Sequence, residues 1–129
     1  MKDNINKYIP HALQYIKQTI ANDADEVDER YDGYAASLGP AIITSGLLPA
    51  IAFYTDIHRG GDSTVKRYMI LNIITSIMIS DGVNIQNSNT NNSLLHHLNI
   101  AANNTPVLKS KILDAVVALK LAFRNFKQV

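Results

Sequence analysis

The sequence predicts an all-α fold, a single compact bundle of about five to six helices over residues 1–129. Three observations predict it. Apolar residues recur at spacings of three and four, as they do on one face of a helix. No segment shows the strict alternation of apolar and polar residues that marks a half-buried strand. The length of 129 residues, 47% of them hydrophobic, suffices for one domain with a substantial core.

The first helix is predicted to begin with Asn6 as its N-cap and to end near Ala21. Pro10 then falls in the first turn, where its missing N–H is tolerated. An acidic hinge follows at residues 22–28, and its carboxylates favour the start of a second helix through the helix dipole. The spacing of the apolar residues assigns the buried face of the first helix to Ile9, Leu13, Ile16 and Ile20.

The second helix is predicted to end at Gly39 and Pro40, because glycine commonly follows a helix end and proline commonly opens the next helix. The third helix, from residue 41 to about 58, is almost entirely apolar. Pro49 removes one backbone hydrogen bond, so we expect it to kink or split this helix. Residues 59–62 form a glycine-containing turn.

The fourth helix is predicted to begin at a cap formed by Ser63 or Thr64 and to continue through Ser80. It is apolar nearly all round, which is typical of a helix in a core or under a partner. The asparagine-rich segment at about residues 82–92 has few core-forming residues, and we expect a loop that is flexible or ordered by a partner. A short helix is predicted over residues 93–102.

Thr105 and Pro106 give the last helix an N-cap followed by proline at the first helical position. No later residue stops this helix, so it is predicted to run to the C-terminus. Apolar residues at spacings of 4, 3, 4 and 3 form a coiled-coil-like seam along it. The seam consists of Ile112, Val116, Leu119, Phe123 and Phe126.

The cations are unevenly distributed: residues 1–62 have a net charge of −4 and residues 63–129 have +5. In the last helix four cations fall within roughly 60° of one another at about 100° per residue, which makes a basic stripe beside the seam. Such a stripe suits the phosphates of a nucleic acid backbone, although it is also typical of a solvated helix end. The candidate RNA-binding residues of the stripe are Lys109, Lys120, Arg124 and Lys127. A second basic group comprises Arg59, Lys66 and Arg67.

The sequence argues against catalysis, cofactors and metal binding. It has no cysteine and no phosphate-binding glycine loop, and the carboxylates at residues 23–32 are expected to cap a helix. His96 and His97 are adjacent, so their side chains diverge by about 100°; one should point inward and the other outward, without sharing a metal. No apolar run approaches the ~20 residues of a membrane span. We therefore expect a cytoplasmic protein with no membrane contact.

Residues 36–54 resemble the small helical subunit family of the Cmr complex, the type III-B CRISPR RNA-guided effector. That family has a signature of the form Pro-x-x-Ile-x-x-Asn-Gly-Leu-x-x-x-x-Ala-Phe after a tyrosine. Residues 118–124 are similar to the end of the family's last helix, and chain length and helix order also agree. The positions that match the signature are Pro40, Ile43, Gly46, Leu47, Ala52 and Phe53, with Tyr31 or Tyr34 upstream.

The resemblance implies a non-catalytic subunit of an antiviral defence complex. Its partners would be other Cmr subunits, copies of itself in a short head-to-tail stack, and the guide RNA and target RNA. Basic residues would support the target strand, while base pairing supplies sequence specificity. No aromatic cluster for reading bases is evident in the sequence.

Two other functions remain open. A protein-only adaptor domain would use the same apolar faces without touching nucleic acid, and the salt dependence of binding distinguishes it from a phosphate-binding protein. A small-molecule enzyme built in a helical bundle is the third hypothesis. Its sign would be a pocket lined by converging polar groups.

Overall fold

The computed structural model describes residues 2–56 and 66–129. Within these ranges the chain is helical apart from loops and two strands of two residues each. The elements in chain order are α1 (Lys2–Thr19), β1 (Glu26–Val27), α2 (Glu29–Ser45), α3 (Leu47–Thr55), α4 (Tyr68–Ser80), α5 (Ser93–Asn99), the 3-10 helix η1 (Ala101–Asn103), α6 (Pro106–Phe123) and β2 (Lys127–Gln128). The predicted all-α bundle is confirmed.

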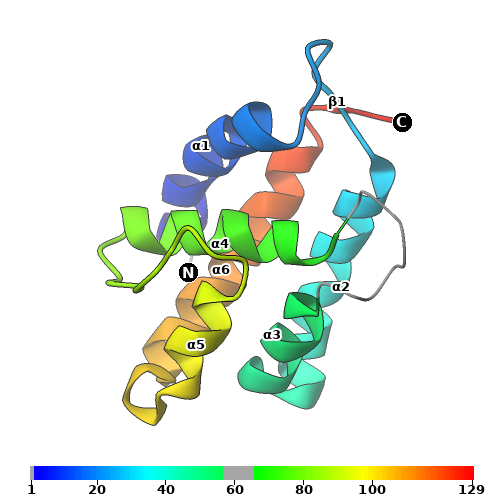
Figure 1. The fold of residues 1–129 in the computed structure, drawn as a ribbon. Helices are drawn as coiled ribbons and strands as arrows, with labels where there is room; N and C mark the ends of the chain where they lie inside the picture. The colour runs from blue at the N-terminus through cyan, green and yellow to red at the C-terminus, as the bar shows by residue number, and fades with distance from the viewer. Residues whose placement is uncertain (1, 57–65) are drawn as a thin grey trace.

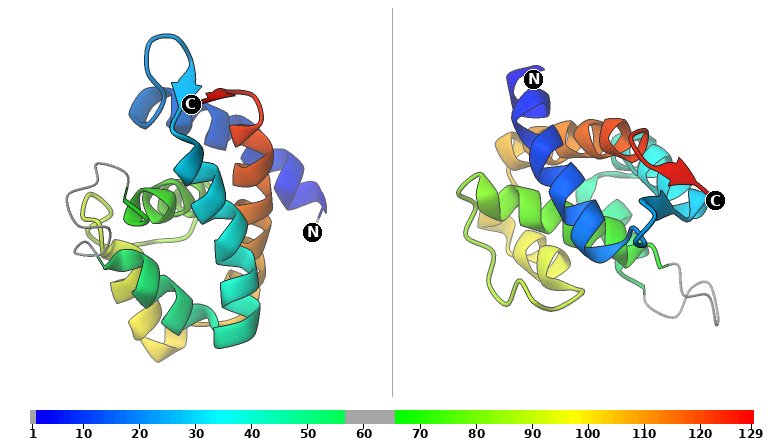
Figure 2. Two further views of the ribbon diagram at one scale, coloured as in Figure 1. Left: turned by 90° about the vertical axis from the view of Figure 1, so that its right-hand side faces the viewer. Right: turned by 90° about the horizontal axis from the view of Figure 1, so that it is seen from above.

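Helix α6 is the centre of the bundle. It contacts α1, α2 and α4, and its contact with α1 is the most extensive between any two elements. In Figure 1, α4 crosses in front of α6, while α3 and α5 lie at the lower end. The two further views show that α2 runs alongside α6 and that α1 crosses α6 (Figure 2). Helices α1, α2 and α4 are therefore packed around one central helix.

Helix α1 begins at Lys2, four residues before the predicted N-cap, so the assignment of Asn6 as a cap is wrong. Pro10 lies inside the helix and deprives the Asn6 carbonyl of its usual donor. Both residues are exposed, so water can bond to that carbonyl. The line of fully buried side chains is Tyr8, Ala12 and Ile16. The predicted face is confirmed as fully buried at Ile16, whereas Ile9, Leu13 and Ile20 lie beside this line and are partly buried against the core.

Helix α2 continues through Gly39 and Pro40, where the sequence predicted its end. Its buried residues keep helical spacing across that point, so packing against α6 overrides the local signal. The break between α2 and α3 falls at Gly46, whose φ of 96° suits glycine. Pro49 consequently lies in the first turn of α3 instead of kinking a long helix. The buried residues of α2, on both sides of Gly39 and Pro40, are Tyr31, Ala35, Leu38 and Ile42.

Helix α4 ends at Ser80, as predicted. It begins at Tyr68, and the described residues 66 and 67 are not helical, so the predicted start at Ser63 or Thr64 is wrong. Ser63, Thr64 and the predicted turn at 59–62 themselves lie outside the described residues. The segment 82–92 contains no helix or strand, and Ile85, 6% exposed, attaches it to the core. The predicted short helix corresponds to α5 followed by η1.

Helix α6 starts as predicted, because the Thr105 hydroxyl accepts a hydrogen bond from the Leu108 amide at 3.1 Å. It ends at Phe123, so the expectation that it runs to the C-terminus is wrong. The chain turns after Phe123, and residues 127–128 pair in parallel with β1 inside the predicted acidic hinge. Two strands of two residues leave no alternation for a sequence pattern to detect.

The carboxylate of Asp81 joins three helices at one point through polar contacts. Asp81, at the end of α4, accepts hydrogen bonds from the Tyr8 hydroxyl at 2.7 Å and from the Lys7 ammonium of α1. Lys111 of α6 lies 3.2 Å from the same carboxylate. The hydrogen bond from Lys7 is the main cause that lowers the pKa of Asp81 to about 2, with further lowering by Tyr8 and Lys111. Asp81 is therefore ionised at neutral pH and holds α1, α4 and α6 together.

Candidate nucleic-acid interface

Helix α6 buries its apolar seam and keeps cations on its outer side. Lys109 and Lys120 are half-buried and Arg124 is exposed, and none of the three forms an ion pair with another described residue. Asp114 is 8% exposed and accepts a hydrogen bond from the Asn4 amide, so this carboxylate lies away from the three cations. The helical part of the predicted seam is confirmed as buried at Ile112, Val116, Leu119 and Phe123.

The cations on α6 are less evenly spaced than the sequence suggested. Lys120 and Arg124 lie one turn apart, about 6 Å along the axis, whereas Lys109 lies about 17 Å before Lys120. The exposed side chain of Val117 lies between these groups. The surface thus offers a close pair of cations and a distant third one.

Three predicted residues lie beyond Phe123, the last residue of α6: Arg124 is the C-cap, whereas Phe126 and Lys127 lie farther along the chain. Lys127 belongs to β2, and its ammonium lies 3.8 Å from the Glu26 carboxylate across the strand pair. Phe126 also follows the helix end and packs partly buried against the core. The prediction of a helical stripe of four cations is therefore wrong for Lys127, because the chain turns after Phe123 and no longer follows the axis of α6.

The second basic group lies just before α4. Arg59 is outside the described residues, whereas Lys66 and Arg67 are half-buried. The guanidinium carbon of Arg67 lies 5.0 Å from the centre of the Tyr34 ring and 5.2 Å from that of Phe53. This arrangement of two aromatic rings around a cation is one that the sequence analysis missed, since the three residues are far apart in the chain and follow no pattern.

A hollow of about 500 Å³ opens between α2, α3 and Arg67. Arg30 from the first turn of α2 also lines it, another residue that the sequence analysis did not single out. Asp28 caps α2 by accepting a hydrogen bond from the Arg30 amide at 2.9 Å, and its carboxylate also binds the Arg30 guanidinium at 2.7 Å. The hydrogen bond from the Arg30 side chain is the main cause that lowers the pKa of Asp28 to about 2, and the hydrogen bond from the Arg30 amide lowers this pKa further. The capping role predicted for the acidic segment is confirmed at this residue.

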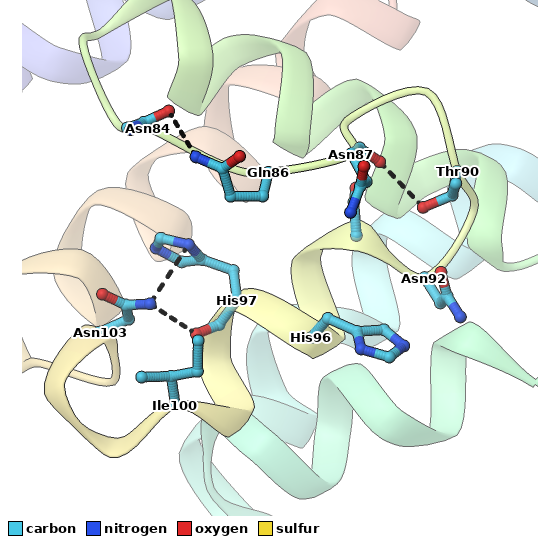
Figure 3. A pocket seen from close by; sticks show the side chains of 10 residues that line it. Asn84, Gln86, Asn87, Thr90, Asn92, His96, His97, Ile100 and Asn103 are labelled. Carbon is cyan, nitrogen blue, oxygen red and sulfur yellow. Dashed lines mark hydrogen bonds between the residues drawn. The ribbon is translucent and has the colours of Figure 1, made fainter.

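A second hollow of about 500 Å³ lies between the segment 82–92 and α5, and Figure 3 shows its polar lining. His97 and His96 point to opposite sides, as the sequence predicted (Figure 3). The Asn103 amide donates a hydrogen bond to the His97 carbonyl at 3.0 Å, and burial lowers the pKa of His97, which keeps it neutral. Polar groups converge here as the enzyme hypothesis required, and the described lining residues include no carboxylate. His96 and His97 are the lining residues that could act as bases, but the Thr90 hydroxyl donates to the Asn87 carbonyl at 2.9 Å instead of to either histidine.

No group of three or more histidine, aspartate or glutamate side chains in residues 2–56 and 66–129 is placed to hold a metal ion. Across those same ranges, every helix is too short or too polar to cross a bilayer.

The fold and these surfaces define a small all-helical domain with cations on its central helix and beside an aromatic pair. Residues 4–122 match the family model of the CRISPR-associated protein Cas_Cmr5. The match covers most of the 129 residues, so the chain belongs to this family of subunits of the type III-B CRISPR complex, Cmr. No curated protein and no solved structure matches the chain.

Proposed function

We propose that this chain is a non-catalytic small subunit of a type III-B Cmr effector and supports the target strand along the guide RNA–target RNA duplex. Membership of the Cas_Cmr5 family supports a place among other Cmr subunits. The observation that carries the RNA contact is the outer side of α6. There Lys120 and Arg124 lie one turn apart without a described ion pair, while Asp114 is buried elsewhere.

The contact is electrostatic and independent of sequence. Cations that meet backbone phosphates release condensed counterions, so binding weakens steeply as salt is added. Base pairing between guide and target supplies the sequence specificity, and the small subunit needs only backbone and shape. A protein that works in this way needs no catalytic group.

Reversing the charges of Lys120 and Arg124 together, K120E/R124E, is expected to weaken retention of target RNA by the assembled effector about tenfold or more near physiological salt. Loss of two phosphate contacts should also reduce the slope of log affinity against log salt by about 1 to 2 units per copy. Filter binding of labelled target RNA across a salt series measures both quantities.

The matched control is K120R/R124K, which keeps both charges at the same positions and should bind as the unaltered protein does. Lys127→Glu changes a cation outside α6 and measures separately whether that residue contributes. If K120E/R124E assembles normally and holds target RNA with unchanged affinity and salt slope, the α6 contact is refuted.

We further propose that copies stack through the end of the bundle where α2 finishes and α6 begins. This end, at the bottom of Figure 1, also carries the turn between α5 and η1. Three large apolar side chains are unusually exposed there: Ile43 at 71%, Ile100 at 60% and Val107 at 68%. Apolar side chains exposed together are typical of a surface that a partner covers.

Replacing Ile43 and Val107 with aspartate, I43D/V107D, is expected to reduce the number of small subunits per assembled particle without unfolding the domain. Each aspartate would place a charge in an interface that excludes water. Native mass spectrometry of the particle counts the copies. Ile79→Asp, at a 40% exposed position on α4, is the control that should leave the count unchanged. An unaltered count in I43D/V107D contradicts stacking through this end.

A protein-only adaptor is the second candidate, and the exposed Val117 between the cations of α6 favours it. Such a surface could accept an apolar side chain of another protein. Docking of this kind changes little with salt, whereas phosphate binding weakens steeply. The salt series described above therefore also separates the two functions.

A further inference from the structure

The hollow between α2 and α3 is distinct from the cation surface of α6. Helix α2 contributes Arg30, Gly33, Tyr34 and Ser37, helix α3 contributes the ring of Phe53, and the chain before α4 contributes Arg67. Its volume of about 500 Å³ falls within the range of sites for small ligands. Tyr54 of α3 also lines it, so two guanidinium groups and three aromatic rings from three separate parts of the chain meet there, and the described lining residues include no carboxylate.

The polar groups in the hollow differ in what they can still bind. The Tyr54 hydroxyl donates to the Tyr34 carbonyl at 2.7 Å, and the Ser37 hydroxyl donates to the Gly33 carbonyl at 2.9 Å, so both donors are used. The Arg67 guanidinium lies over two rings and makes no hydrogen bond or ion pair with another described residue. Its N–H groups are therefore the donors that the hollow offers to a ligand.

The aromatic rings hold this guanidinium in place. Tyr34 and Phe53 both lie within about 5 Å of it, a distance at which a cation is attracted to a ring face. The planar fork of arginine is suited to two oxygens of one phosphate, and less of its freedom is lost when it is already positioned. Phe53 is 46% exposed, so part of its ring remains accessible for stacking.

We propose that this hollow binds one unpaired nucleotide of RNA, with its phosphate on Arg67 and its base stacked on Phe53. The inference rests on the proposed RNA-supporting function but concerns different residues from those on α6. An unpaired nucleotide fits best because its base is free to stack, which a base inside a duplex is not. Stacking tolerates any base, so the site should show little sequence preference. An acidic protein segment could also bind Arg67, but it offers no planar base to stack on Phe53.

The test is a titration of the isolated full-length chain with uridine 5′-monophosphate, followed by the backbone amide signals in nuclear magnetic resonance spectra. We expect signals of Gly33, Ser37, Phe53 and Arg67 to shift. Uridine alone and inorganic phosphate alone should each bind more weakly than the nucleotide. Arg67→Lys keeps the charge but loses the planar fork, and Phe53→Leu keeps apolar bulk but loses the ring. Each should weaken binding about fivefold or more. Lys17→Ala, which removes an exposed cation from the last turn of α1, is the control that should bind normally.

The proposal is overturned if the nucleotide shifts none of these signals, if both variants bind it as the unaltered chain does, or if an oligoglutamate peptide shifts them more strongly than the nucleotide. A second measurement, by crosslinking, uses the unaltered chain and so does not depend on whether a variant folds. Target RNA containing 5-iodouridine should crosslink to Phe53 in the assembled effector, and crosslinks found only elsewhere would also overturn the proposal. Since K120E/R124E tests α6 in a separate assay, failure here leaves that contact standing.

Discussion

Phe123→Ala is expected to destabilise the domain by about 3–5 kcal/mol, the usual cost of removing a fully buried aromatic side chain. Phe123 is 0% exposed at the last position of α6. Loss of the ring would leave a cavity beside the central helix, where packing cannot collapse easily. Urea unfolding followed by circular dichroism measures the change in the free energy of unfolding.

Val117→Ala on the same helix is the matched control. Val117 is 41% exposed, so its truncation should cost less than about 1 kcal/mol. A loss for Phe123→Ala as small as that of the control would mean that the end of α6 is not packed as described. Because Arg124 directly follows Phe123, the same variant should also loosen the cation pair on the outer side.

Asp81→Asn should cost about 2 kcal/mol of stability at pH 7. The pKa of Asp81 is about 2 in the folded protein, against about 3.9 in an unfolded chain. A carboxyl group whose folded pKa is depressed adds stability that is complete above the unfolded pKa and is lost as pH falls through the folded value. The difference between the unaltered chain and the variant should therefore shrink between about pH 4 and pH 2.

Urea unfolding at several pH values in this range checks the prediction. Asp23→Asn is the control, since Asp23 is exposed and forms no ion pair with another described residue. Its effect on stability should be small at every pH. A difference between the unaltered chain and Asp81→Asn that persists undiminished at pH 2 would show that Asp81 acts through its shape and not its charge.

The helices were predictable where local signals and tertiary packing agree. Thr105 and Pro106 marked the start of α6 because a side-chain cap and a proline at the first position are both local features. The sequence misplaced the end of α2 because Gly39 and Pro40 resemble a terminator. The buried face of α2 nevertheless continues past them onto α6, and only the folded core provides that information.

The candidate site was predictable only in part. Lys120 and Arg124 follow from helical spacing, whereas the departure of Lys127 depends on pairing with β1, about a hundred positions earlier. The grouping of Arg67 with two aromatic rings depends on how three helices pack. No periodic pattern within one segment records a contact of that kind.

The central position of α6 has a consequence for biosynthesis. This helix follows α1, α2 and α4 in the chain and therefore leaves the ribosome after them, yet all three pack against it. Their apolar surfaces stay uncovered until α6 emerges, a state in which chains are prone to aggregate. Synthesis of α6 therefore precedes formation of the core, and a chaperone can bind the exposed surfaces in that interval.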